Sequence, residues 1–81
     1  MYTVTIYTTG PDCMACRMTK RAMDKAGITY TEVDLRRDPA AQAYVTDELG
    51  HSTAPVVIVE DGTDQHHWSG FRPDAIKNLT R

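Results

Sequence analysis

The hydrophobic positions of this chain change their spacing several times, and each change marks the boundary of a predicted element. From Tyr2 to Thr8, apolar Val4 and Ile6 alternate with threonine and tyrosine, a period-two pattern typical of a β-strand. Gly10-Pro11-Asp12 then supplies a turn sequence. The pattern therefore predicts an opening strand followed by a sharp turn.

After this turn the spacing becomes helical. The predicted helix runs from about Cys13 to Ala26, and Gly27 stands where a helix usually ends. The stripe that we expect to face the core consists of Ala15, Met18, Ala22 and Ala26.

A second strand and a second helix follow. Ile28 to Leu35 alternates again, and Asp38-Pro39 combines a helix N-cap with a proline at the first helical position. Gly50 ends the second helix. Its apolar stripe is formed by Ala41, Tyr44, Val45 and Leu49.

The last third of the chain predicts a hairpin and a short helix. Val56–Val59 is an unbroken apolar run, as in a buried strand, and Asp61-Gly62 is a hairpin turn sequence. A strand should return antiparallel through Thr63 to Trp68, and Pro73 opens the final helix. The residues of that helix predicted to face inward are Ala75, Ile76 and Leu79.

The element order βαβ-α-ββα defines the α/β class. A right-handed βαβ crossover makes the first two strands parallel, and the hairpin completes a four-stranded mixed sheet with three helices on its two faces. This is the minimal thioredoxin/glutaredoxin fold. With 81 residues, we expect residues 1–81 to form a single domain.

Composition narrows the function classes. No stretch reaches the roughly 20 apolar residues that span a bilayer, and Met1–Ile6 does not resemble a signal peptide. A net charge of −2 argues against nucleic acid as the main partner. Two cysteines without an export signal favour a reducing, cytoplasmic compartment. We expect a cytoplasmic monomer that binds neither nucleic acid nor membrane.

Basic side chains gather in the first part of the chain, where residues 1–26 carry four basic and two acidic residues. Two interpretations stay open for this cluster: a solvated helix face or a docking surface for an acidic partner. Its members are Arg17, Lys20, Arg21 and Lys25.

The candidate chemistry lies in Cys13-Met14-Ala15-Cys16, at the junction of the first strand and helix. A CxxC pair there is typical of a reversible dithiol. The alternative, a zinc site, needs further ligands, and the remaining candidates are His51, His66 and His67. The adjacent pair would point to opposite faces of a strand, so we expect no metal and interpret those two as exposed histidines.

The position of Cys13 at the helix start indicates its role. Free N–H groups and the positive end of the helix dipole favour a thiolate there, and Arg17 adds a positive charge. Cys16 follows one turn deeper, so we expect Cys13 to be the nucleophile and Cys16 to resolve the mixed disulfide. Asp12 opposes this by placing a negative charge beside Cys13.

Thr53-Ala54-Pro55 precedes the buried Val56 strand. That strand is expected to run antiparallel to the first one, which places Pro55 beside the end that leads to Cys13. A cis bond at Pro55 would turn the backbone of Ala54 outward to pair with an extended substrate segment.

These motifs together resemble the NrdH-redoxin family of glutaredoxin-like proteins. The resemblance extends over essentially the whole chain, and its most specific part is Trp68-Ser69-Gly70-Phe71-Arg72-Pro73-Asp74. It implies a thioredoxin fold, a cis Pro55 and no cofactor beyond the Cys13–Cys16 pair. It also implies reduction by thioredoxin reductase and electron donation to the large subunit of class Ib ribonucleotide reductase.

The resemblance also suggests which residues contact partners. We expect this surface to include Met14, Ala15, Arg17, Thr53, Ala54, Pro55 and the segment Trp68–Asp74. Within that segment, Phe71, Trp68 and Arg72 should narrow a glutathione groove, although Trp68 is equally consistent with a core position. The chain lacks the lysine that is common before the motif in this family. The alternatives are a glutathione-dependent glutaredoxin and a CxxC metal-binding module.

Overall fold

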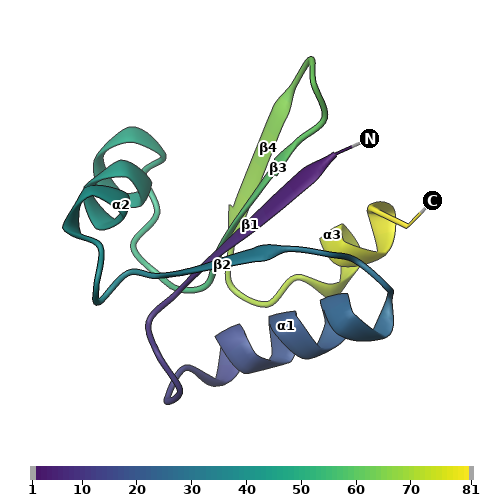
Figure 1. Cartoon of the computed structure of the whole chain (residues 1–81), viewed down its shortest axis with the longest axis horizontal. Coiled ribbons are helices and arrows are strands. Elements are labelled where there is room, and N and C mark those ends of the chain that lie inside the picture. The colour runs from purple at the N-terminus through teal and green to yellow at the C-terminus, as the bar shows by residue number, and fades with distance from the viewer. Residues whose placement is uncertain (1, 81) are drawn as a thin grey trace.

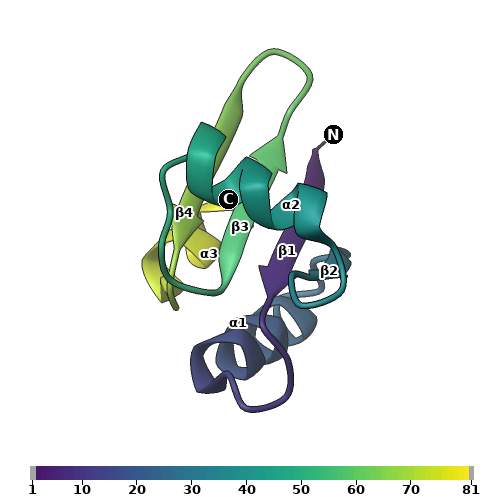
Figure 2. The same cartoon turned by 90° about the vertical axis from the view of Figure 1, so that its left-hand side faces the viewer.

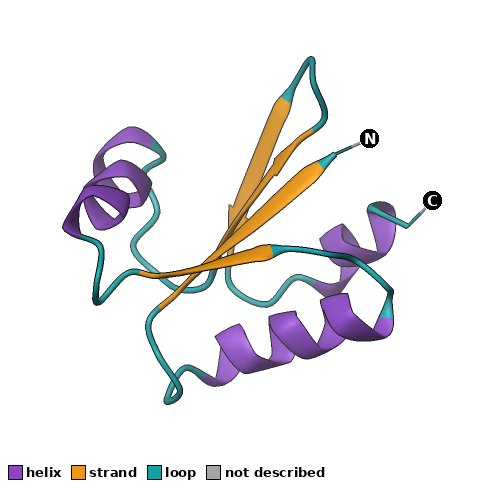
Figure 3. Cartoon of the chain, viewed as in Figure 1, coloured by secondary structure: helices purple, strands orange, loops and turns teal. Residues whose placement is uncertain are grey.

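The computed structural model describes residues 2–80 and shows one four-stranded sheet between helices. The strands are β1 (Thr3–Thr8), β2 (Thr31–Asp34), β3 (Val56–Glu60) and β4 (Gln65–Ser69). The helices are α1 (Met14–Lys25), α2 (Pro39–Ala43) with the π-helical turn η1 (Tyr44–Glu48), and α3 (Pro73–Asn78). Figure 3 shows these elements coloured by type. The predicted α/β class and element order are confirmed.

The sheet has the predicted mixed topology. Its strand order is β2-β1-β3-β4, with β1 parallel to β2 and antiparallel to β3, and with β3 antiparallel to β4. Helices α1 and α3 cover one face, and α2 covers the other (Figures 1 and 2). Tyr7 lies opposite Val56, so the start of β3 adjoins the end of β1 that leads to the cysteines.

The unbroken apolar run of β3 is explained by these two covered faces. Val57 and Val59 belong to a core cluster with Met23 of α1 and Ile76 of α3. Val56 and Ile58 instead pack in a cluster on the α2 side, with Leu35 and Val45. Because successive strand residues point to opposite faces, a strand buried on both sides needs apolar residues at every position.

The buried face of α1 differs from the predicted stripe. Its fully buried members are Cys16, Thr19 and Met23, whereas Met18 is 43 % exposed and Ala26 is also exposed. Thr19 tolerates burial because its hydroxyl donates to the Ala15 carbonyl at 2.8 Å. A buried threonine with this local bond adds no unsatisfied polar group. The prediction of Met18 as core was therefore wrong, since the pattern counted Thr19 as polar.

Strand β2 is shorter than predicted because Ile28 belongs to the end of α1. Gly27 adopts φ +74°, its N–H donates to Asp24 O at 3.1 Å, and the N–H of Ile28 donates to Met23 O at 2.9 Å. This is a Schellman motif, in which the residue after the glycine packs back on the helix. Ile28 and Met23 accordingly share the same core cluster.

The remaining boundaries follow local capping groups. Asp38 caps α2 by accepting from the N–H of Ala41 at 3.0 Å, as predicted. The wider η1 turn, in which Leu49 N–H donates to Tyr44 O at 3.1 Å, was not predicted. Asp61 Oδ1 accepts from the N–H groups of Thr63 and Asp64, so these residues form the hairpin turn and β4 begins at Gln65.

Candidate active site

The two cysteines form a disulfide at the start of α1. Cys13 is the N-cap residue with extended backbone, and its sulfur accepts from the N–H of Cys16 at 3.1 Å. The Cα atoms lie 5.2 Å apart. The Cys13 sulfur thus occupies the place where side-chain acceptors satisfy the free N–H groups of a helix. A thiolate formed there meets the positive end of a helix of 12 residues.

The two sulfur-bearing residues differ in access. Cys13 is partly exposed, whereas Cys16 is only 1 % exposed and packs into the protein. The next residue, Met14, is 63 % exposed, and Met18 follows on the same face at i+4. A second molecule can therefore reach the sulfur of Cys13 but not that of Cys16. Exposed methionines next to a reactive sulfur form an adaptable apolar contact surface.

The Ala54–Pro55 peptide bond is cis, as expected. Pro55 is buried, and its carbonyl accepts from the N–H of Gly70 at 2.8 Å. Thr53 donates its hydroxyl hydrogen bond to Ser69 Oγ at 3.2 Å. These two hydrogen bonds join the segment at the start of β3 to the segment at the end of β4. In the site predicted from the sequence, these segments are separate parts.

The segment Trp68–Asp74 divides into parts with different environments. Arg72 and Asp74 are exposed and form a two-pronged ion pair, with Nε–Oδ1 and Nη2–Oδ2 distances of 3.1 and 2.9 Å. This hydrogen bonding lowers the pKa of Asp74. Phe71 packs against the core and borders a shallow depression of about 240 Å³ with Met18 and the basic residue Arg21 of α1.

Trp68 packs against the core cluster of the α1–α3 face. It also lines a larger cavity of about 540 Å³ with Tyr2 and Leu79, at the opposite end of β1 from the cysteines. Its indole Nε1 is buried and has no hydrogen-bond partner among residues 2–80. Of the two interpretations left open for Trp68, these contacts favour the core position.

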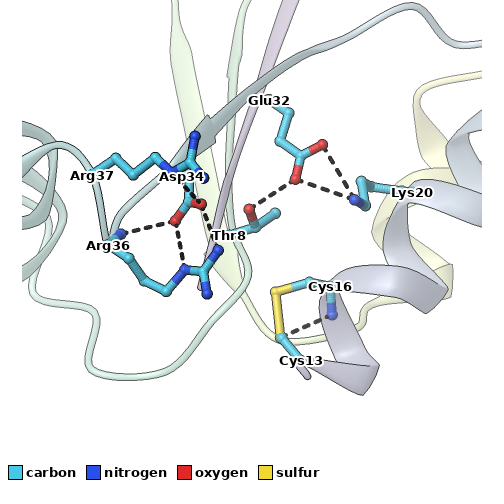
Figure 4. Close-up of polar contacts among 8 residues, drawn as sticks. All are labelled: Thr8, Cys13, Cys16, Lys20, Glu32, Asp34, Arg36 and Arg37. Atoms are coloured by element: carbon cyan, nitrogen blue, oxygen red, sulfur yellow. Dashed lines mark hydrogen bonds and ion pairs between the residues drawn. A yellow bond between two sulfur atoms is a disulfide. The ribbon is translucent and has the colours of Figure 1, made fainter. Parts of the chain in front are cut away.

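A polar network behind Cys16 was not predicted. Thr8 is 1 % exposed, and its hydroxyl donates to Glu32 Oε2 at 2.9 Å. Lys20 Nζ binds the same carboxylate oxygen at 3.1 Å. Figure 4 shows this network above the disulfide, with Thr8 between Glu32 and Cys16. Lys20 is therefore engaged by Glu32, and the sequence held no signal for this pairing because the residues are 12 and 24 positions apart.

Two of the three histidines lie on the edge strand β4. His66 and His67 are exposed on the edge strand β4, as expected, but His67 Nδ1 also contacts His51 Nε2 at 2.7 Å. Within residues 2–80, a cluster of possible metal donors occurs at the hairpin turn. It consists of exposed Asp61, Asp64 and His66. The N–H groups of Asp64 and Thr63 hydrogen-bond to Asp61 Oδ1 and lower the pKa of Asp61, so this oxygen is already used by the turn.

None of the helices within residues 2–80 has the length and apolar composition needed to span a bilayer.

Comparison with known proteins adds the family. The glutaredoxin family model matches residues 4–63. The glutaredoxin-like protein NrdH of Escherichia coli K12 is 42 % identical over 76 residues, covering 94 % of this chain and 86 % of that one. The Gene 56 protein of Mycobacterium phage D29 is 36 % identical over 79 residues, covering 94 % and 80 %.

Solved structures agree with this assignment. NrdH-redoxin from Escherichia coli, described as having a thioredoxin-like activity profile, matches with a TM-score of 0.77, 39 % identity and coverage of 95 % and 93 %. The thioredoxin-like protein BC3987 matches with a TM-score of 0.80 and 26 % identity, covering 95 % of this chain and 99 % of that one. A paired CxxC at a helix start, on this fold and with these relatives, is the centre of a thiol–disulfide oxidoreductase. The chain thus belongs to the glutaredoxin family and, within it, to the NrdH-redoxins.

Proposed function

We propose that this protein carries electrons from thioredoxin reductase to a class Ib ribonucleotide reductase through the Cys13–Cys16 dithiol. The observation that carries the proposal is the partly exposed Cys13 linked by a disulfide to the buried Cys16, in a chain 42 % identical to an NrdH protein. The pair supplies the electrons itself, so the proposed chemistry needs no cofactor.

The proposed exchange has two steps. The Cys13 thiolate attacks one sulfur of the target disulfide, that bond breaks, and the other target sulfur leaves as a thiolate that takes a proton. Cys16 then loses its proton and attacks Cys13, which releases the second target thiol. The target gains two electrons and two protons, and Cys13–Cys16 becomes a disulfide. Thioredoxin reductase restores the dithiol with electrons from NADPH.

Exposed apolar side chains support a docking surface around Cys13. Met14 and Met18 form one face of α1, and Phe71 borders the same helix from the segment after β4. The proposed contact set also includes Ala15, Arg17 and the backbone of Thr53–Ala54, with Pro55 at the start of β3. From the Trp68–Asp74 segment it includes Ser69, Gly70, Arg72, Pro73 and Asp74. We further propose a cytoplasmic monomer that works as one domain.

The match to the glutaredoxin family model keeps a second candidate, a glutathione-dependent glutaredoxin. Two features favour thioredoxin reductase over glutathione. The residue before Cys13 is Asp12, which repels a glutathione carboxylate, although an exposed pair of charges contributes only about 0–1 kcal/mol. Phe71, which packs against the core and borders the depression beside Met18 of α1, supplies the larger, steric part.

The decisive experiment measures NADPH oxidation in two parallel assays. One contains thioredoxin reductase, this protein and a disulfide substrate; the other contains glutathione and glutathione reductase in its place. We expect turnover only in the first. Comparable turnover with glutathione would assign the protein to the second candidate. If Phe71 excludes glutathione sterically, Phe71→Ala should raise the rate with glutathione. The melting temperature of this variant is measured as a control for folding.

A further inference from the structure

The turn that precedes Cys13 is covered by an arginine from another part of the chain. Gly10 adopts φ +105°, and a Cβ on Gly10 would lie 2.5 Å from Cζ and 2.6 Å from Nη1 of Arg36. The guanidinium therefore lies directly over the Cα atom of Gly10. Any other residue would meet both an unfavourable backbone angle and this side chain.

Arg36 is held in place by Asp34 at the end of β2 (Figure 4). Its Nε and Nη2 donate to the two carboxylate oxygens at 3.1 and 2.9 Å, and its backbone N–H donates to Oδ1 at 2.9 Å. These hydrogen bonds lower the pKa of Asp34 to about 2, so the carboxylate stays charged near neutral pH. A planar two-pronged pair fixes orientation as well as distance.

The Gly10–Asp12 turn connects this arginine to the reactive cysteine. The carbonyl of Gly10 accepts from the N–H of Cys13 at 3.2 Å, so moving Gly10 moves the N-cap residue of α1. The negative charge of Asp12 contributes to the raised pKa of Arg36, behind the larger effect of Asp34. The positive charge of the guanidinium thus lies close enough to Asp12, the residue before Cys13, for the two charges to attract.

We propose that Arg36 is a positioning residue for the Cys13 thiolate: held by Asp34, it fixes the Gly10–Asp12 turn and offsets the charge of Asp12. This inference rests on the proposed role of Cys13 as nucleophile.

Other charged groups around Cys13 are accounted for separately. On α1, Arg17 is exposed one turn after Cys13, and Lys20 is paired with Glu32 of β2 at 3.1 Å. Asp34 is occupied by the arginines that follow it. Arg36 is the cation in contact with the turn itself.

The neighbouring Arg37 provides a matched control. It has the same charge and approaches the same Asp34 carboxylate, but at 3.9 Å and with a side chain 85 % exposed, compared with 2.9 Å and 52 % for Arg36. A long-range charge effect would be similar for the two residues. A positioning effect through Gly10 would belong to Arg36 alone.

The experiment compares Arg36→Gln, Arg37→Gln and Arg36→Lys in the full reduced chain. The pKa of the reactive thiol is followed by the pH dependence of alkylation, with the modified cysteine identified by mass spectrometry. We expect Arg36→Gln to raise the Cys13 pKa by about half a unit, Arg36→Lys to restore part of the shift, and Arg37→Gln to change little. At a pH above the Cys13 pKa of both proteins, the equilibrium with a thiol–disulfide buffer should move about threefold toward the disulfide, or about 14 mV.

Gly10→Ala tests the contact from the other side, because its methyl group displaces the guanidinium. We expect Gly10→Ala to raise the Cys13 pKa as Arg36→Gln does. Combining Gly10→Ala with Arg36→Gln should raise the Cys13 pKa no further. Equal shifts for Arg36→Gln and Arg37→Gln, or an unchanged Cys13 pKa in Arg36→Gln, would overturn the proposal for Arg36 while leaving Cys13 as nucleophile. First alkylation at Cys16 would instead overturn the nucleophile assignment and this proposal together.

Discussion

At the scale of single residues, the two cysteines lie in different environments, which supports the different roles proposed for them. Cys13 accepts a backbone hydrogen bond at the open end of α1, whereas Cys16 is only 1 % exposed. Thiolate character and access control disulfide exchange, and both favour attack by Cys13. The burial of Cys16 supports its proposed role, which is attack on a sulfur that is already covalently attached to the protein.

We therefore expect Cys16→Ser to accumulate a mixed disulfide between Cys13 and a disulfide-containing target peptide. The first exchange step is intact in this variant, but no second thiol is present to release the peptide. Mass spectrometry of the non-reduced protein measures the adduct. Cys13→Ser is the matched control, and it should show no adduct and no disulfide reduction. An equal adduct in both variants would reverse the assignment of roles.

At the scale of elements, α1 shows how a single polar residue changes the buried face of a helix. Thr19 is fully buried and bonded to the Ala15 carbonyl, and Met23 continues the same face one turn later. Met18 projects on the outer side, next to the depression bordered by Phe71. The face that appeared most apolar in the sequence is thus partly exposed.

This register predicts different costs for two methionine substitutions in one helix. Met23→Ala should lower the free energy of unfolding by about 2–5 kcal/mol, because it leaves a cavity at a fully buried position. Met18→Ala is the matched control and should cost less than about 1 kcal/mol, because its side chain is 43 % exposed. Urea unfolding measures both values. Comparable losses of stability in the two variants would support Met18 as a core residue, as the sequence pattern predicted.

Met18→Ala also tests the proposed docking surface. We expect it to weaken turnover with the protein target while leaving the rate with a small disulfide reagent unchanged, because only a large partner extends to the second turn of α1. An equal loss with both substrates would contradict a role in docking.

At the scale of the whole molecule, segments that are distant in the sequence contact each other, as a loop and the edge strand β4 do here. His51, in the connection after η1, contacts His67 of β4 at 2.7 Å. Burial, followed by the charge of His67, lowers the pKa of His51. The contact uses one N–H and one free ring nitrogen, so it is lost when both rings are protonated.

This pair gives the stability a pH dependence of known sign. The pKa of His51 in the folded state lies below its unfolded value of about 6.5, so the unfolded chain binds more protons in the window below that pH. We expect the thermal midpoint to fall as the pH decreases from about 7.5 to about 5, a range that spans the unfolded histidine pKa of about 6.5. His51→Gln should reduce this fall. His66→Gln, on the opposite face of β4, is the control, and an unchanged fall in His51→Gln would exclude the pair as its source.

Local chemistry in the sequence was sufficient for the element order and the cysteine pair. The period-two spacing around Val4 and Ile6, the Asp38 cap and the turn at Asp61 each act within a few residues, so their effects can be inferred without knowing the rest of the fold. The CxxC spacing at a strand–helix junction likewise predicted the disulfide. The family to which the protein belongs was also predicted from the motifs across the chain.

The tertiary structure decided which side chains meet across the fold. Arg36 came to lie over Gly10 because the parallel pairing of β1 and β2 brings the ends of both strands together. The contact of His51 with His67 depends in the same way on the packing of a loop against β4. Such contacts join residues 16 to 26 positions apart, and no local spacing encodes them. The sequence by itself thus determined the dithiol and its helix, whereas the electrostatic surroundings of that dithiol arose only when the sheet assembled.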